Sequence, residues 1–151
     1  MDALGLRAAR EANGSDEPEL RILVIDDDDS VATAIRLILA RRRSETELAS
    51  RASIGIQTLE SSRFDALLID LFMPGMSGLD AITHIRHRGS PIPIIAMSGF
   101  RLRSPHNSFD YMSLAMQRGA SAYLRKPFSP EQLIEAINRS LASASPANES
   151  A

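Results

Sequence analysis

Short apolar runs alternate with helical patterns along most of this chain. Five runs predict strands because they are short and rich in apolar and β-branched residues, the weakest being the second: 20–25, 46–49, 66–71, 92–98 and 122–125. Apolar residues recur at helical spacing after each of them, and these stripes predict helices around 31–39, 54–59, 79–85, 109–116 and 133–141. In the fourth stripe, we expect Met112 and Met116 to be core residues.

This alternation predicts an α/β fold, a doubly wound five-stranded parallel sheet with five helices. Strands buried on both faces read as continuous apolar runs, and right-handed crossovers then place helices on both sides of the sheet. The segments 1–19 and 142–151 contain many small, polar and turn-forming residues. We therefore expect a single domain at 20–141 between two disordered tails.

The amino-acid composition of the chain argues against several classes of function. The 151 residues carry a formal net charge of −2 and no cysteine, which excludes disulfides, thiol catalysis and thiolate metal sites. The near-neutral balance gives no support for direct nucleic-acid binding or for an anionic membrane partner. We find neither a signal peptide nor an apolar stretch near the ~20 residues of a membrane span, so a cytoplasmic location is expected. With ten residues after Leu141, no output module is expected.

Polar residues stand where four of the predicted strands end: Asp26, Asp27, Asp70, Ser98 and Lys126. Because parallel strands end at one edge of the sheet, three carboxylates, a hydroxyl and an ammonium group should meet there. Clustered carboxylates repel unless one takes a proton or a cation lies between them. Oxygen ligands with open positions suit Mg²⁺. These positions therefore predict a magnesium site.

The acids that follow have a simpler interpretation. Asp28 and Asp29 directly precede a helical stripe, where short polar side chains cap the first turn and negative charge suits the helix dipole. Lys126 is unusual in another way, because it is the single lysine among 17 basic residues. Lysine offers a compact ammonium on a flexible stem, whereas arginine offers a planar fork.

Three segments together resemble the signatures of response-regulator receiver domains, which have a flavodoxin-like fold. They are Val24-Ile25-Asp26-Asp27-Asp28-Asp29-Ser30, Leu68-Ile69-Asp70-Leu71-Phe72-Met73-Pro74-Gly75-Met76-Ser77-Gly78 and Lys126-Pro127-Phe128. Each is moderately specific alone. All three in order, with Ser98 between the last two, are highly specific, and the resemblance extends from Leu20 to Leu141.

The resemblance implies a metal site and a phosphoryl acceptor. Asp26 and Asp27 match the acidic pair that holds Mg²⁺, directly and through water. Asp70 matches the aspartate that takes a phosphoryl group from a histidine kinase or a histidine phosphotransfer protein. Phe72 matches the position whose backbone carbonyl completes the metal shell.

It also implies a switch. Ser98 matches the hydroxyl that swings toward the phosphoryl group, and Tyr123 matches the aromatic residue whose ring follows inward. Lys126 matches the lysine that pairs with the phosphoryl oxygens, usually before a cis peptide to proline, here Pro127. The chain would then be a signalling switch that assists its own phosphorylation and dephosphorylation, rather than a turnover enzyme. Its output would be a changed protein-interaction surface. The resemblance is compatible with an oligomer as well as with a monomer.

Two features qualify the resemblance. The stretch 99–108 is longer than the family usually has, which indicates either harmless loop variation or an altered interaction surface. In receivers, the side chains two positions after the acceptor and after the hydroxyl flank the water that hydrolyses the aspartyl phosphate. Here they are Phe72 and Phe100, both apolar, which predicts a slowly decaying phosphoryl group. The alternative is that Phe72 or Phe100 points away into the core or a partner surface.

Other interpretations compete with this one. A phosphatase resembling the haloacid dehalogenase class would use Asp26-x-Asp28 as its nucleophile motif, but would leave Pro74-Gly75 and Lys126-Pro127 unexplained. A binding module that has lost its chemistry conflicts with the complete set of site residues. His84 and His87 lie three apart on one predicted helix, where solvated histidines are commoner than metal ligands.

Overall fold

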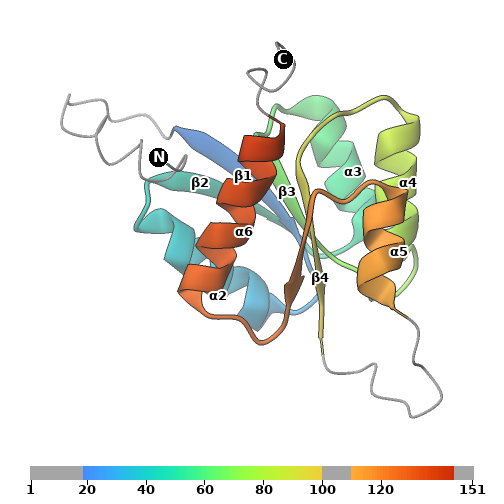
Figure 1. Ribbon diagram of the computed structural model, residues 1–151. Coiled ribbons are helices and arrows are strands. Elements are labelled where there is room, and N and C mark those ends of the chain that lie inside the picture. Colours follow the sequence, from blue (N-terminus) through green and yellow to red (C-terminus); the bar gives the residue numbers. More distant parts are fainter. Residues whose placement is uncertain (1–18, 100–109, 145–151) are drawn as a thin grey trace, which may run out of the picture.

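The computed structural model describes residues 19–99 and 110–144, and Figure 1 shows their arrangement. The elements are β1 (Leu20–Ile25), α2 (Asp29–Ala40), β2 (Ser44–Ala49), α3 (Ala52–Ser61), β3 (Ala66–Asp70), α4 (Gly78–His87), β4 (Ile94–Ser98), α5 (Tyr111–Arg118), β5 (Ala122–Arg125) and α6 (Pro130–Ser143). All strand pairs are parallel, in the order β2-β1-β3-β4-β5. Helices α2 and α6 cover one face, and α3, α4 and α5 cover the other (Figure 1). The predicted doubly wound α/β fold is confirmed.

The central strands are buried on both faces because successive side chains point to opposite sides of a sheet. In β1, Leu23 and Ile25 belong to the core beneath α3, α4 and α5, whereas Ile22 and Val24 belong to the core beneath α2 and α6. All four are fully buried. The continuous apolar runs in the sequence therefore reflect two cores rather than one.

Several loops at the carboxyl ends of the strands lead into helices whose first turns are capped by side chains. The Asp28 carboxylate accepts hydrogen bonds from the Ser30 and Val31 N–H groups and begins α2, as predicted. Ser77 caps α4 in the same way. Ser129 begins α6 in a reciprocal capping box with Gln132. These caps hold short loops, and hence the polar residues on them, in fixed positions at one edge of the sheet.

Several boundaries differ by about two residues from those predicted. Strand β2 begins at Ser44 rather than at residue 46, and β4 begins at Ile94, so Pro93 precedes the strand. Helix α6 continues to Ser143, past the predicted end of the domain at Leu141. Most of the predicted tails at 1–19 and 142–151, and most of the long 99–108 loop, lie outside the described residues.

The prediction for Met112 and Met116 is wrong. These residues are 42% and 43% exposed, and the buried residue of α5 is Ala115. The inward stripe consists of Tyr111, Leu114 and Ala115, which pack against the core at spacings of three and four residues. Methionine occurred at helical spacing on the outward face, and periodicity alone did not reveal which stripe faces the sheet.

Among residues 19–99 and 110–144, none of the helices is both long enough and apolar enough to cross a membrane.

Candidate functional site

The carboxyl ends of the strands bring together three carboxylates that lie far apart in the sequence. Asp26 and Asp27 follow β1, and Asp70 is the last residue of β3. One carboxylate oxygen from each lies within 4.8 Å of the others. Strands β1 and β3 are neighbours, so their ends lie side by side at this edge. The predicted acidic cluster is confirmed.

Asp26 is buried, and both of its carboxylate oxygens have partners. Oδ1 accepts a hydrogen bond from the Asp28 N–H at 2.9 Å, and Oδ2 lies 2.6 Å from the Lys126 ammonium. The residue is 1% exposed, whereas the neighbouring Asp27 is exposed. The pair therefore offers one carboxylate held in place by the protein and one that is open to solvent.

Asp70 sits between opposing influences. Its pKa is raised overall from 3.8 to about 6, with burial as the largest cause and the Asp26 carboxylate as a further one. The Lys126 ammonium, 3.5 Å from Oδ2, and the Phe72 N–H, which donates to Oδ1 at 3.2 Å, both lower the pKa. Removal from water is the largest of these effects. At neutral pH, Asp70 is still mostly a carboxylate and so retains a nucleophilic oxygen.

The donor set fits a hard divalent cation. Three carboxylates without nitrogen or sulfur ligands are typical of Mg²⁺ sites that keep open positions for water and phosphate. Within the described parts of the chain, no other cluster of this kind occurs. Phe72 lies in the loop directly after Asp70, with its N–H facing the carboxylate. The role of its carbonyl as a metal ligand stays a prediction.

Lys126 connects the acids to the end of β5. Its ammonium contacts both Asp26 and Asp70, and its side chain is only 15% exposed. The peptide bond from Lys126 to Pro127 is cis, as the resemblance implied. The cluster therefore has one cation directly between two of its three carboxylates.

Ser98 and Tyr123, the predicted switch pair, are in direct contact. The Ser98 hydroxyl at the end of β4 is hydrogen-bonded to the Tyr123 hydroxyl from β5. Burial raises the pKa of Tyr123, and the nearby Arg125 guanidinium lowers it. Ser98 is almost fully buried, whereas Tyr123 is half-buried. Movement of one hydroxyl must therefore affect the other.

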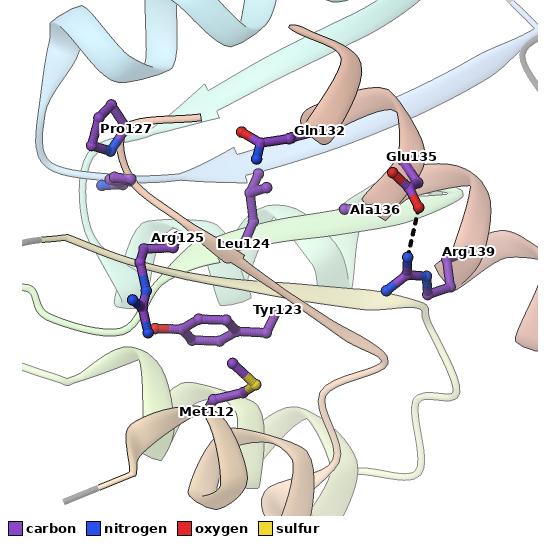
Figure 2. Close-up of a pocket in the computed structure, with 10 residues that line it drawn as sticks. Met112, Tyr123, Leu124, Arg125, Pro127, Gln132, Glu135, Ala136 and Arg139 are labelled. Carbon is purple, nitrogen blue, oxygen red and sulfur yellow. Dashed lines mark hydrogen bonds and ion pairs between the residues drawn. The ribbon is translucent and has the colours of Figure 1, made fainter. Parts of the chain in front are cut away.

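Sequence reasoning did not single out Arg125, the last residue of β5. Figure 2 shows its guanidinium beside the Tyr123 hydroxyl, at the edge of a groove of about 570 Å³ between α5, β5 and α6. The two residues are i and i+2 on a strand, so their side chains leave the same face of the sheet. That spacing was the signal in the sequence by which Arg125 could have been found.

Two further expectations are tested in part. The Phe72 ring packs edge-on against Tyr111 of α5, with ring centroids 4.8 Å apart, while Phe100 lies outside the described residues. His84 lines a pocket together with residues of α3, and His87 lies in a different depression beside Arg86 and Arg118. The two histidines thus face different surroundings, which agrees with their interpretation as ordinary helix residues.

Comparison with known proteins agrees with this geometry. The family model of the response regulator receiver domain matches residues 22–138. Response regulator MprA of Mycobacterium avium is 32% identical over 115 residues, which cover 76% of this chain and 48% of MprA. Transcriptional regulatory protein DltR of Streptococcus agalactiae is 29% identical over 118 residues, 78% of this chain and 50% of DltR. The chain thus spans about half the length of these curated relatives.

Solved structures give the same result. A response regulator receiver domain protein from Clostridium thermocellum superposes with a TM-score of 0.71 at 31% identity, covering 82% of this chain and 95% of that one. Full-length FixJ from B. japonicum gives a TM-score of 0.75 at 28% identity, covering 87% of this chain and 62% of FixJ. The sequence match, the fold and the acidic cluster agree. The chain belongs to the response regulator receiver domain family.

Proposed function

We propose that Asp70 accepts a phosphoryl group from a histidine kinase or a histidine phosphotransfer protein, in a step that requires Mg²⁺. The observation that carries the proposal is Lys126, whose ammonium contacts both Asp26 and Asp70 beside a third carboxylate. This arrangement lets an anionic donor approach a group of carboxylates, because positive charge is already present where phosphoryl oxygens must lie.

The chemical step is an exchange of bonds at phosphorus. A carboxylate oxygen of Asp70 attacks and forms an acyl phosphate, the P–N bond of the donor phosphohistidine breaks, and its electron pair stays on the imidazole nitrogen. Lys126 pairs with oxygens of the transferred group. Asp26, Asp27, Asp70 and the Phe72 carbonyl would hold Mg²⁺, which when bound neutralises negative charge on the phosphoryl oxygens.

The product explains a switch rather than steady turnover. Phosphorylation of Asp70 adds charge and acceptor oxygens that the Ser98 hydroxyl can approach, and this hydroxyl is hydrogen-bonded to Tyr123. A shift of this pair alters the surface near α5 and β5, and we propose that a downstream protein binds there, without direct nucleic-acid contact by this domain. The proposal places the domain in the cytoplasm, where ATP charges the phosphohistidine donors. We also propose a stand-alone arrangement, which would distinguish this chain from the relatives named above, because those are about twice as long.

A phosphatase that uses Asp26 as its nucleophile is disfavoured. Asp26 is 1% exposed, and its two oxygens are engaged by the Asp28 N–H and by Lys126. Attack by Asp26 on a substrate would first break one of these contacts.

Intact-mass measurement after incubation with acetyl phosphate tests the proposal. We expect one added phosphoryl group on the wild type with Mg²⁺, none in excess chelator and none on Asp70→Asn. The exposed Asp29→Asn serves as the matched control and should be labelled like the wild type. Labelling of Asp70→Asn, or sustained hydrolysis of a phosphate ester that Asp26→Asn abolishes, would contradict it.

A further inference from the structure

Arg125 stands beside the switch pair without being part of the acidic cluster. It is the last residue of β5, pairs in register with Ser98 of β4 and lies two residues after Tyr123. Strand alternation places the Arg125 and Tyr123 side chains on the same face. In Figure 2 the guanidinium lies against the phenol oxygen at the edge of the groove between α5, β5 and α6.

Arg125, Tyr123 and Ser98 differ in the hydrogen bonds that their side chains can donate and accept. Arginine has five N–H donors and no acceptor, whereas a tyrosine or serine hydroxyl has one proton to donate and an oxygen that accepts. An Arg125 N–H can therefore only donate to the phenol oxygen. A phenol that accepts from a cation becomes a better donor, because its O–H bond is further polarised. Its proton is then best directed to the Ser98 oxygen, with which it is already paired.

The direction of the hydrogen bond between Tyr123 and Ser98 determines where the Ser98 proton goes. If Tyr123 donates to Ser98, the Ser98 proton is free to donate elsewhere. If Ser98 donates to Tyr123, that proton is used and Ser98 can only accept. A phosphoryl group offers only acceptor oxygens, so the first arrangement is the productive one.

We propose that Arg125 is a positioning residue that fixes the direction of the Tyr123–Ser98 hydrogen bond, so that Ser98 keeps its proton for the phosphoryl group on Asp70. This inference rests on the proposed function of Asp70. Arg125 acts through Tyr123 and does not touch the acidic cluster in the described structure.

The electrostatic surroundings of the phenol agree with this role. The charged groups facing it are Arg125 from its own strand and Asp110, the N-cap of α5. Burial raises the pKa of Tyr123, Arg125 lowers it by charge and hydrogen bonding, and Asp110 raises it. Arg125 is thus the group that favours donation by the phenol.

Titration of Tyr123 tests the contact directly. The chain has two tyrosines and no tryptophan, so in a Tyr111→Phe background the phenolate absorbance reports Tyr123 alone. Arg125→Ala should raise the pKa of Tyr123 by ~0.5 to 1 unit, while Arg125→Lys, which keeps charge and donors, should restore most of the original value. The control is Arg139→Ala, an arginine of the same groove that is paired with Glu135, and it should leave the titration unchanged.

Phosphorylation kinetics test the consequence. With acetyl phosphate and Mg²⁺, Arg125→Ala should slow labelling of Asp70 by about threefold to tenfold, the range of one polar contact. In a Tyr123→Phe background, which has no phenol oxygen, Arg125→Ala should change the rate by less than about twofold. An equal loss in both backgrounds, or an unchanged Tyr123 titration in Arg125→Ala, would overturn the proposal.

The two measurements separate this inference from the proposed function. The titration needs no phosphorylation, so it reports the Arg125–Tyr123 contact even if Asp70 is never labelled. Failure of labelling in the wild type would contradict the function of Asp70. Normal labelling with an equal rate loss in both backgrounds would contradict only the role of Arg125.

Discussion

At the scale of single residues, the site is a balance of charge around one ammonium group. Lys126 lies 2.6 Å from Asp26 and 3.5 Å from Asp70, and both carboxylates are largely removed from water. Burial favours protonation of Asp70, and the nearby Lys126 ammonium opposes it. The position of the chain's single lysine at this point is therefore explained by the need for a small cation.

Lys126→Arg should consequently impair the site, although every other basic residue is arginine. The planar fork is larger than an ammonium and would crowd the two carboxylates and an incoming phosphoryl group. We expect phosphorylation of Asp70 to slow by about tenfold or more, measured as the rate of mass increase with acetyl phosphate. The exposed Arg51→Lys is the reverse exchange away from the site and should have no effect. A wild-type rate for Lys126→Arg would contradict this explanation.

Asp70 should make folding stability depend on pH in a defined direction. Its pKa is about 6 in the folded chain against an ordinary 3.8, so the folded state binds the proton more tightly. The resulting stability is fully present below about pH 4 and is lost as the pH rises through 6. In chelator, Asp70→Asn should therefore be more stable than the wild type at pH 8, by about 1 to 3 kcal/mol, and similar to it at pH 4.

Denaturant unfolding at the two pH values measures this difference. Asp29→Asn, an exposed acid in the first turn of α2, serves as the control and should show no comparable gain at pH 8. A gain for Asp70→Asn that is equal at pH 4 and pH 8 would show that charge burial is not its cause.

At the scale of elements, the start of α4 is fitted closely against the end of β3. The Gly78 N–H donates to the Leu71 carbonyl at 3.0 Å. A Cβ atom at Gly78 would lie 2.2 Å from the Asp70 carbonyl oxygen and 2.6 Å from the Leu71 Cα. Both are backbone atoms that cannot turn aside, so this helix can reach the acceptor strand only with glycine here.

Gly78→Ala should therefore destabilise the fold by ~2 kcal/mol or more and displace the loop that carries Asp70. Gly75 in the same loop provides a contrast, because its φ is +80° but no atom lies within 4 Å of an added Cβ. Gly75→Ala should cost about 1 to 2 kcal/mol from backbone conformation alone. Thermal or denaturant unfolding of both variants shows which one loses more stability. A smaller loss for Gly78→Ala than for Gly75→Ala would contradict the steric explanation.

The loop after Asp70 is also tied to α5 by the rings of Phe72 and Tyr111. The contact fixes an apolar ring two residues from the acceptor, at a position that we expect to flank the hydrolytic water. We expect Phe72→Asn to speed decay of the phosphoprotein by ~10-fold or more, because amide groups can orient water. Phe72→Leu keeps the position apolar and should decay at nearly the wild-type rate. Equal decay of all three proteins would exclude shielding by Phe72.

At the scale of the whole molecule, the acidic cluster couples cation binding to folding. Asp26 follows β1 and Asp70 is the last residue of β3, and they meet only when β1 and β3 are paired. A cation that binds this arrangement must therefore stabilise the folded chain relative to the unfolded one. The coupling is a property of the assembled sheet and not of any single segment.

Mg²⁺ at ten times its dissociation constant should raise the free energy of unfolding by about 1.4 kcal/mol. Asp27→Ala is the informative variant, because Asp27 is exposed and its loss leaves the Lys126 contacts intact. Its stability should be close to that of the wild type in chelator and should rise much less with Mg²⁺. A matched ionic strength of NaCl controls for screening, and an equal gain from NaCl would contradict a specific site.

The local pattern determined the elements and the chemistry of the site. Apolar runs closed by acids placed β1 and β3 correctly, because a strand buried on both faces has no polar position to interrupt it. The Asp28 cap followed from the same local rules. The acids, Ser98 and Lys126 could be assigned to one edge because all carboxyl ends of a parallel sheet lie there.

Only the tertiary structure decided which faces are covered and which side chains meet. It showed that α5 packs through Ala115 and leaves Met112 exposed, because the phase of a helix against a sheet depends on the neighbouring elements. It also placed Lys126 nearer to Asp26 than to Asp70, and Arg125 beside Tyr123. Such contacts join residues on different strands or depend on side-chain direction. Sequence periodicity indicates that an element has distinct faces, but the face that is covered and the distances between side chains are decided only when the elements pack together.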